Sequence, residues 1–342
     1  MPDPRDDLPP INERGPVDRA TFEEIAAAGR PVVLRGQVAD WPAVAAARRS
    51  DAALAELLLG SANGEPVELW IAPPELAGRF DFADDRSSRN HIVRRAPIAV
   101  LLDFVLRQAE LERPEGVYAG AIPLARHLPG LRDECAMPLI DVTPDTLVSL
   151  WLGNRTRTAA HWDQPRNLAC VVAGRRRFTL FPPDAVGDLY VGAVDVTLAG
   201  QPSSLVDVTD PDLARFPRFR DALTRAATAE LGPGDVLYLP SLWWHHVEAL
   251  DQVGAMVNFW WRAGPAGRPN PLDALYHALL SLRDLPQSER EGWRAFFDHY
   301  VFTDGEAAWA HLAEDRRGVF APLTDDRIAA LKAHLAASLR CD

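Results

Sequence analysis

Apolar positions in the first third of the chain recur mostly at helical spacing. Residues 1–20 are rich in proline and charge, so we expect this segment to be extended or mobile. Thr21 and Glu24 have the spacing of a capping box, and Gly29 ends the short helix that follows. The pattern predicts helices over residues 21–28, 43–60 and 96–112 and strands over residues 30–36 and 66–71.

The pattern changes over residues 116–262 to short β-branched and aromatic runs separated by glycine and proline turns. Such regular spacing of short strands is typical of an all-β barrel or sandwich. The expected strands are residues 117–119, 146–152, 168–173, 177–181, 229–231, 236–239, 246–250 and 255–261.

Helical spacing returns after Pro271. It predicts helices over residues 272–282, 289–299, 306–313 and 325–339. Apolar stripes on the first and last of these helices must be buried against something; they comprise Ala274, Leu275, Ala278, Leu279, Ile328, Leu331, Leu335 and Leu339. The whole pattern predicts an extended segment (1–20), an α/β flank (21–115), a barrel (116–265) and a helical region (266–342).

Composition narrows the class of protein. With 342 residues, 47% of them hydrophobic and 25% charged, the chain can bury a sizeable core. A net charge of −12 has the wrong sign for a protein that grips nucleic acid. No apolar run reaches the ~20 residues that a membrane span needs, and residues 1–15 lack the layout of a signal peptide, so we expect a cytoplasmic protein.

Two residue types constrain the chemistry further. Cys135, Cys170 and Cys341 are odd in number and widely spaced, which excludes a disulfide framework and a CxxC metal site. Lys332 is the only lysine, so 35 of the 36 basic residues are arginine. A site that needs a fixed cation in the barrel must therefore use arginine.

A candidate metal site appears where His161, Trp162 and Asp163 precede an apolar strand. If this stretch is extended, His161 and Asp163 project to one face and Trp162 to the other. A third ligand is available after the turn at residues 232–235, where two tryptophans precede His245 and His246. Two histidines and one carboxylate form the facial triad of non-haem Fe(II) oxygenases.

Several ordered blocks of the sequence resemble the JmjC and cupin-like Fe(II)/2-oxoglutarate oxygenases, especially their asparaginyl hydroxylases. The blocks are residues 158–163, Asn167, 174–183, 233–240, 243–248 and 257–260. The resemblance is specific over about residues 145–262 and looser over 31–144. It implies a double-stranded β-helix, the jelly-roll barrel of cupins, with flanking N-terminal helices and a C-terminal helical region.

The resemblance also implies a ligand set and a reaction. The metal ligands would be His161, Asp163 and His245; His246 is the competing choice, but adjacent strand residues face opposite ways. Fe(II) and the cosubstrate 2-oxoglutarate would support hydroxylation of a C–H bond in a protein side chain or a small molecule, with release of succinate and CO2. A cupin metalloenzyme without 2-oxoglutarate and a non-catalytic binding module are the alternatives.

One implied position departs from the family pattern. The cation that holds the distal carboxylate of 2-oxoglutarate is a lysine in similar proteins, and the matching residue here is Arg176, with Arg177 or Arg157 next in line. The resemblance implies further cosubstrate contacts from Thr158, Tyr118, Asn167 and Asn258. It also implies a homodimer through the C-terminal helices. The acidic net charge and the lack of a long apolar run favour neither nucleic acid nor a membrane as a partner.

Overall fold

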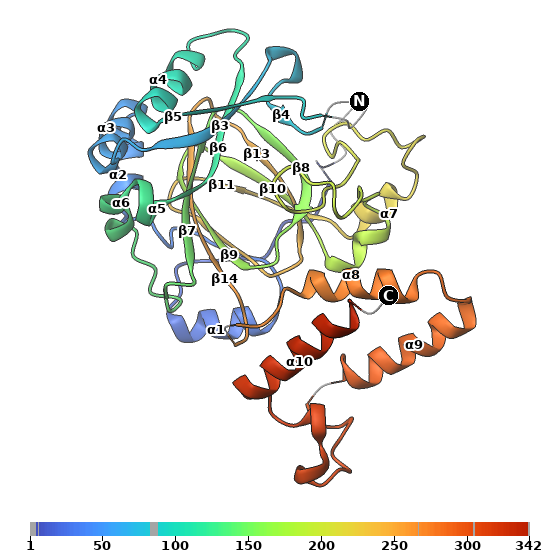
Figure 1. Ribbon diagram of the computed structural model, residues 1–342. Helices are drawn as coiled ribbons and strands as arrows, with labels where there is room; N and C mark the ends of the chain where they lie inside the picture. The colour runs from blue at the N-terminus through green and yellow to red at the C-terminus, as the bar shows by residue number, and fades with distance from the viewer. Residues whose placement is uncertain (1–4, 6, 83–87, 266, 304, 341–342) are drawn as a thin grey trace. The chain divides into compact units, whose positions relative to one another are not determined.

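The computed structural model divides the chain into two compact units, Met1–Gly264 and Pro265–Asp342 (Figure 1). It describes residues 5, 7–82, 88–265, 267–303 and 305–340. Cys341 lies outside the described residues. Among the helices within that part of the chain, none is long and apolar enough to cross a membrane.

Two β-sheets form the frame of the first unit (Figure 1). The nine-stranded sheet has the order β1-β2-β12-β9-β14-β7-β6-β3-β5. Its strands are β1 (Glu13–Arg14), β2 (Val32–Leu34), β3 (Pro66–Ala72), β5 (Ile92–Pro97), β6 (Gly116–Pro123), β7 (Leu147–Gly153), β9 (Arg166–Ala173), β12 (Val236–Leu239) and β14 (Gly254–Trp261). The five-stranded sheet, of order β11-β10-β13-β8-β4, consists of β4 (Arg79–Phe80), β8 (Arg157–Trp162), β10 (Arg176–Phe181), β11 (Ala227–Leu231) and β13 (Trp244–Ala249).

The sheets are mainly antiparallel, and strands distant in sequence pair in both of them. This is the jelly-roll arrangement that the sequence predicts. Apolar residues from both sheets pack between them, including Val171, Phe178, Leu180 and Leu237. The rest of the space between the sheets contains the cavity described below, which polar and aromatic side chains line together.

Helices and a long connection cover the outer faces. The main hydrophobic cluster joins the nine-stranded sheet to the N-terminal helices, with Phe22, Leu54 and Leu101 among its members. These helices are α1 (Arg19–Ala27), α2 (Pro42–Arg49), α3 (Asp51–Ser61), α4 (Ile98–Gln108), α5 (Leu124–His127) and α6 (Pro129–Glu134). A separate cluster packs the connection between β10 and β11, with the turn η2 (Pro183–Gly187) and helix α7 (Phe219–Thr224), against the five-stranded sheet.

Two helical expectations need correction. The segment expected as one helix over 43–60 is two, because Ser50 is extended and its hydroxyl accepts a hydrogen bond from the Ala53 amide as the cap of α3. The helix expected over 306–313 is wrong: residues 305–310 form turns. Gly305 has a left-handed φ of 63°, and the Trp309 ring stacks on Phe320 at 5.2 Å, which favours a compact turn.

The second unit is helical. It contains α8 (Pro271–Leu282), α9 (Gln287–Tyr300) and α10 (Asp325–Ser338), with short turns η3 (Glu314–Arg316) and η4 (Gly318–Phe320) before α10. Lys332 on α10 donates a hydrogen bond to the Gly267 carbonyl at 3.1 Å. Among its described residues only Ala308 and Ala321 are buried, so this unit has almost no core of its own.

Candidate metal centre and adjoining cavity

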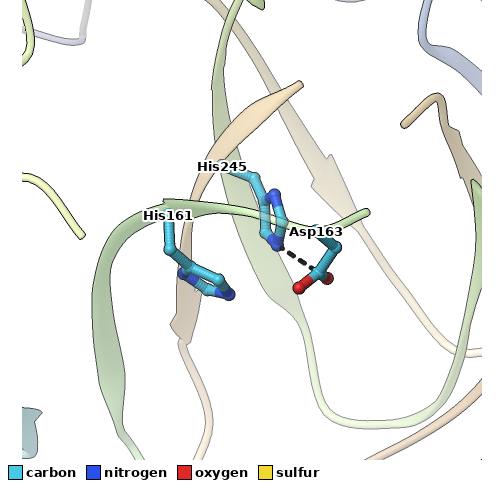
Figure 2. A group of neighbouring side chains, drawn as sticks. All are labelled: His161, Asp163 and His245. Carbon is cyan, nitrogen blue, oxygen red and sulfur yellow. Dashed lines mark ion pairs between the residues drawn. The ribbon is translucent and has the colours of Figure 1, made fainter. Parts of the chain in front are cut away.

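Strand pairing brings the two histidines of the candidate triad together. His161 on β8 lies directly opposite His245 on β13, and their ring centroids are 4.2 Å apart. Asp163 follows the end of β8, where its carbonyl accepts a hydrogen bond from the Leu242 amide at 2.9 Å. Figure 2 shows the three side chains converging, with the imidazole of His245 next to the carboxylate of Asp163.

The geometry of the triad suits a metal ion. One ligand atom from each residue lies within 4.8 Å of the others. The Nδ1 of His161 donates to the Ala159 carbonyl at 2.8 Å, and the Nδ1 of His245 donates to the Trp243 carbonyl at 3.0 Å. These bonds fix both tautomers so that each Nε2 keeps a lone pair for a metal. The Nε2 of His245 lies 3.5 Å from Oδ2 of Asp163.

The electrostatics of the triad favour the states that bind metal. Burial, followed by the adjacent imidazole of His245, lowers the pKa of His161 to about 4, so its ring is neutral at pH 7. Burial raises the pKa of Asp163, but the adjacent imidazoles of His245 and His161 outweigh burial and lower this pKa below its ordinary value. A neutral imidazole and a charged carboxylate are the forms that coordinate a cation.

His246 faces the other way. It lies opposite Thr179 on β10, whereas His245 lies opposite Leu180. Its Nδ1 donates to the Thr158 carbonyl at 2.6 Å, and the group of residues able to share one metal ion does not include it. The alternation expected along β13 therefore holds.

The triad lines a cavity of about 450 Å³ between the sheets. Four of the five residues expected to contact a cosubstrate also line it, namely Tyr118, Thr158, Asn167 and Arg176. Asn258 does not line it: it is fully buried behind the wall, accepts a hydrogen bond from the Trp151 indole at 2.8 Å and donates to Asn167 at 3.4 Å. Asn258 thus orients two lining residues rather than lining the cavity itself.

Arg176 is a buried cation that faces the cavity. It is 4% exposed, and among the described residues no carboxylate forms an ion pair with it. Burial lowers its pKa, and Tyr118 is the nearby group that opposes this shift. An unpaired buried guanidinium is costly unless an anion binds to it.

The neighbouring arginines already have acidic partners. Arg175 pairs with Glu230 at 2.9 Å and with Asp251 at 3.0 Å. Arg177 lies 3.8 Å from Glu230, and Arg157 lies 3.8 Å from Asp207. The alternation along β10 thus leaves Arg176 as the arginine of this run that lines the cavity.

Two hydroxyl-bearing residues, Thr158 and Tyr118, also line the cavity. Oγ1 of Thr158 is buried and has no hydrogen-bond partner among the described residues, and burial raises the pKa of Tyr118 well above its ordinary value. Buried hydroxyls normally have partners, so a bound diacid would satisfy the Thr158 hydroxyl.

The sequence analysis missed an aromatic wall on the nine-stranded sheet. Trp70, Tyr118, Trp151 and Trp260 line the cavity, and successive rings lie 5.6 to 6.1 Å apart. Gly120 permits this packing, because a Cβ at that position would lie 2.7 Å from the Trp151 ring. The signal in the sequence is weak, since aromatic residues on strands are ordinary core residues in most proteins.

Comparison with known proteins identifies the family. Residues 18–267 match the model of the cupin-like domain family, and the chain belongs to it. This membership confirms the resemblance to the JmjC and cupin-like proteins. The chain is 26% identical over 278 residues to the human bifunctional peptidase and (3S)-lysyl hydroxylase JMJD7, covering 74% of this chain and 83% of that protein.

Other relatives match over shorter regions. The chain is 29% identical over 176 residues to the Arabidopsis thaliana lysine-specific demethylase JMJ31, covering 48% of this chain and 31% of that protein. It is 40% identical over 114 residues to human HSPB1-associated protein 1, covering 33% of this chain and 23% of that protein. The matches thus span a third or less of these two relatives.

Proposed function

We propose that this protein is an Fe(II)- and 2-oxoglutarate-dependent oxygenase that hydroxylates a C–H bond of a protein side chain or a small molecule. The observation that supports this most is the coexistence of two groups in one cavity. A His-His-Asp triad lies in the same cavity as the buried guanidinium of Arg176, which has no acidic partner among the described residues. The triad suits a metal cation, and the guanidinium suits a carboxylate.

The residues present fit both groups. His161, Asp163 and His245 would hold iron, because three protein ligands leave coordination positions open for other molecules. Arg176 would hold the distal carboxylate of 2-oxoglutarate in a bidentate manner, and the hydroxyl-bearing Thr158 lines the same cavity. When bound, iron and 2-oxoglutarate would supply the oxidising chemistry with dioxygen as the oxidant: one oxygen atom enters succinate as the oxoacid loses CO2, and the other becomes the hydroxyl of the oxidised C–H bond.

The protein's own residues orient the metal ligands and shape the wall of the cavity. Backbone carbonyls orient both imidazoles through their Nδ1 atoms, and the β8–β13 pairing fixes the distance between them. Asn167 and Asn258, linked at 3.4 Å, hold the polar part of the wall. The aromatic wall would present an apolar surface to a substrate C–H bond in the cavity.

Succinate formation tests this proposal. Purified protein with Fe(II), ascorbate and 2-oxoglutarate should form succinate, even without its substrate, and His245→Ala should form none. Metal binding without succinate formation or 2-oxoglutarate binding would favour a cupin metalloenzyme that does not use 2-oxoglutarate. Failure to bind metal would favour a non-catalytic binding module.

The relatives support a protein substrate over a small molecule. One similar protein is named a lysyl hydroxylase and two are named lysine-specific demethylases. These names describe proteins that act on protein side chains. We therefore propose a protein side chain as the first substrate class to test, with peptide libraries in the succinate assay.

We also propose that the protein is a homodimer through its C-terminal helices. The second unit exposes many large apolar side chains, including Trp293 (46% exposed), Phe296 (56%) and Phe302 (70%). Among its described residues it buries almost no apolar side chains. Helices with so little core need a partner surface. A two-fold dimer is the commonest assembly that provides one.

A further inference from the structure

His246, next to the candidate ligand His245, is a buried residue that the metal site does not use. It is 3% exposed and lies on the outer face of β13, away from the cavity. Its Nε2 is buried without a hydrogen bond and lies 3.7 Å from the carboxylate of Glu248, which forms an ion pair with Arg5. Its strongest interaction is the 2.6 Å hydrogen bond from Nδ1 to the Thr158 carbonyl.

This hydrogen bond lies at an irregularity between β8 and β13. Val247 pairs with Thr158 and His245 pairs with His161, so Ala159 and Ala160 lie opposite the single residue His246. Such a bulge interrupts regular pairing and re-aims the side chains beside it. The bulge therefore lies between Thr158 and His161 of the triad, which both line the cavity.

Three successive carbonyls of the bulge have different partners. The Thr158 carbonyl accepts from His246, the Ala159 carbonyl accepts from the Nδ1 of His161, and the Ala160 carbonyl accepts from the Ser204 amide at 2.7 Å. His161 is thus held by a bond of its own, in addition to its pairing with His245. Among the described residues the Thr158 hydroxyl has no such bond, so its direction depends on the Thr158 backbone, which pairs with Val247 and Phe80 and accepts the His246 hydrogen bond.

We propose that His246 is a positioning residue that holds the Thr158 backbone so that the Thr158 hydroxyl points at the cosubstrate carboxylate. This inference rests on the proposed use of 2-oxoglutarate. It separates the roles of two adjacent histidines: His245 serves the metal, and His246 serves the diacid. Loss of the His246 hydrogen bond should weaken diacid binding while leaving the metal in place.

Calorimetric titration of the full chain with Mn(II), and then with 2-oxoglutarate, tests this role without turnover. His246→Leu should weaken 2-oxoglutarate binding about 5- to 20-fold, the effect of losing one to two hydrogen bonds, and should change Mn(II) affinity by less than about 2-fold. His246→Asn should restore much of the diacid affinity, because its side-chain amide can donate from near the Nδ1 position. His127→Leu, a buried histidine that does not line the cavity, should change neither affinity.

Coupling to Thr158 separates positioning from a general loss of stability. In a Thr158→Val background, His246→Leu should add little further loss of 2-oxoglutarate affinity, since the hydroxyl that it positions is already gone. Additive losses, unchanged diacid affinity in His246→Leu, or an equal loss of Mn(II) binding would each overturn the inference. If the wild-type protein with Mn(II) does not bind 2-oxoglutarate, the proposed function fails first, and the inference fails with it.

Discussion

At the scale of single residues, the orientation of each imidazole depends on the backbone carbonyl to which its Nδ1 donates a hydrogen bond. His161 and His245 each donate to a backbone carbonyl two residues earlier, which leaves both Nε2 atoms directed at one point beside Asp163. His246 finds the Thr158 carbonyl across the strand pair. Adjacent histidines thus differ in role because strand alternation offers them different acceptors.

This difference predicts a clear contrast in metal binding. His161→Ala and His245→Ala should each lower Fe(II) or Mn(II) affinity by more than about 100-fold, because each removes a direct ligand rather than a supporting contact. His246→Ala should leave metal affinity largely intact. Titration calorimetry checks this, and retained affinity in His245→Ala with loss in His246→Ala would reverse the ligand assignment.

For Arg176 we expect the opposite result: loss of 2-oxoglutarate affinity with metal affinity unchanged. Arg176→Met should weaken 2-oxoglutarate binding by about 30-fold or more, since losing one partner of a buried charged pair typically costs 2 to 5 kcal/mol or more. Metal affinity should be unchanged, because Arg176 is not among the residues that can share the metal. The exposed Arg175→Met is the matched control on the same hairpin. Equal cosubstrate affinity in Arg176→Met and wild type would place the anchor elsewhere.

The lowered pKa of a third residue, His91, makes the stability of the fold depend on pH. His91 is buried beside Trp70 and Phe80, and burial, together with the nearby Arg89, lowers its pKa to about 4, from 6.5. As pH falls from about 6.5 to about 4, His91 becomes protonated in the unfolded state but stays neutral in the folded state. The free energy of unfolding therefore decreases. This histidine should account for about 1 to 3 kcal/mol of that decrease.

Urea denaturation at pH 7 and pH 4.5 measures this contribution. His91→Phe should lose less stability than wild type between the two pH values, because Phe has no proton to gain. An identical loss in the two proteins would show that His91 does not titrate in this range.

At the scale of elements, close approach between strands shapes the wall of the cavity. Gly153 on β7 lies against β6, where a Cβ would lie 2.4 Å from the Val117 carbonyl oxygen and 3.2 Å from the Tyr118 Cα. These are backbone atoms, so the strand itself would have to move. Since Tyr118 lines the cavity, this contact couples the packing of the sheet to the shape of the site.

Gly153→Ala should therefore destabilise the fold by about 1 to 3 kcal/mol, the typical cost of overpacking. Gly187→Ala, where a Cβ would meet nothing within 4 Å, should stay within about 0.5 kcal/mol of wild type. The midpoints of chemical denaturation compare the two variants. Equal midpoints would show that β6 can move away from a Cβ at position 153 without a loss of stability.

At the scale of the whole molecule, the two units differ in how they bury apolar surface. The first unit has three buried hydrophobic clusters. The second unit buries two alanines among its described residues and stacks its aromatic side chains on one another, including Tyr300 on Phe320 at 5.3 Å. A partner surface would remove these rings from water.

The proposed homodimer should therefore depend on the aromatic residues of α9 and the turn after it. Light scattering at micromolar concentration should give about twice the 37.6 kDa mass of one chain. Phe296→Arg with Phe302→Arg should shift it to the single-chain mass, whereas Val186→Arg, at a 52% exposed site of the first unit, should not. A single-chain mass for the wild-type protein would contradict the dimer.

The sequence by itself determined the barrel and the polarity of its strands. The alternation of side chains along a strand separated His245 from His246, and the same rule puts Arg176 on the same face of its strand as Phe178. These features are local, because the side-chain period of a strand is fixed at two residues. The short apolar runs likewise predicted most strands of the two sheets.

Only the tertiary structure decided which of these residues meet. Pairing of β8 with β13 places His161 opposite His245, and the bulge there gives His246 its acceptor. The aromatic wall and the position of Asn258 behind it also depend on contacts between distant segments. Register between strands depends on the packing of the whole barrel, so no local pattern of residues could specify it.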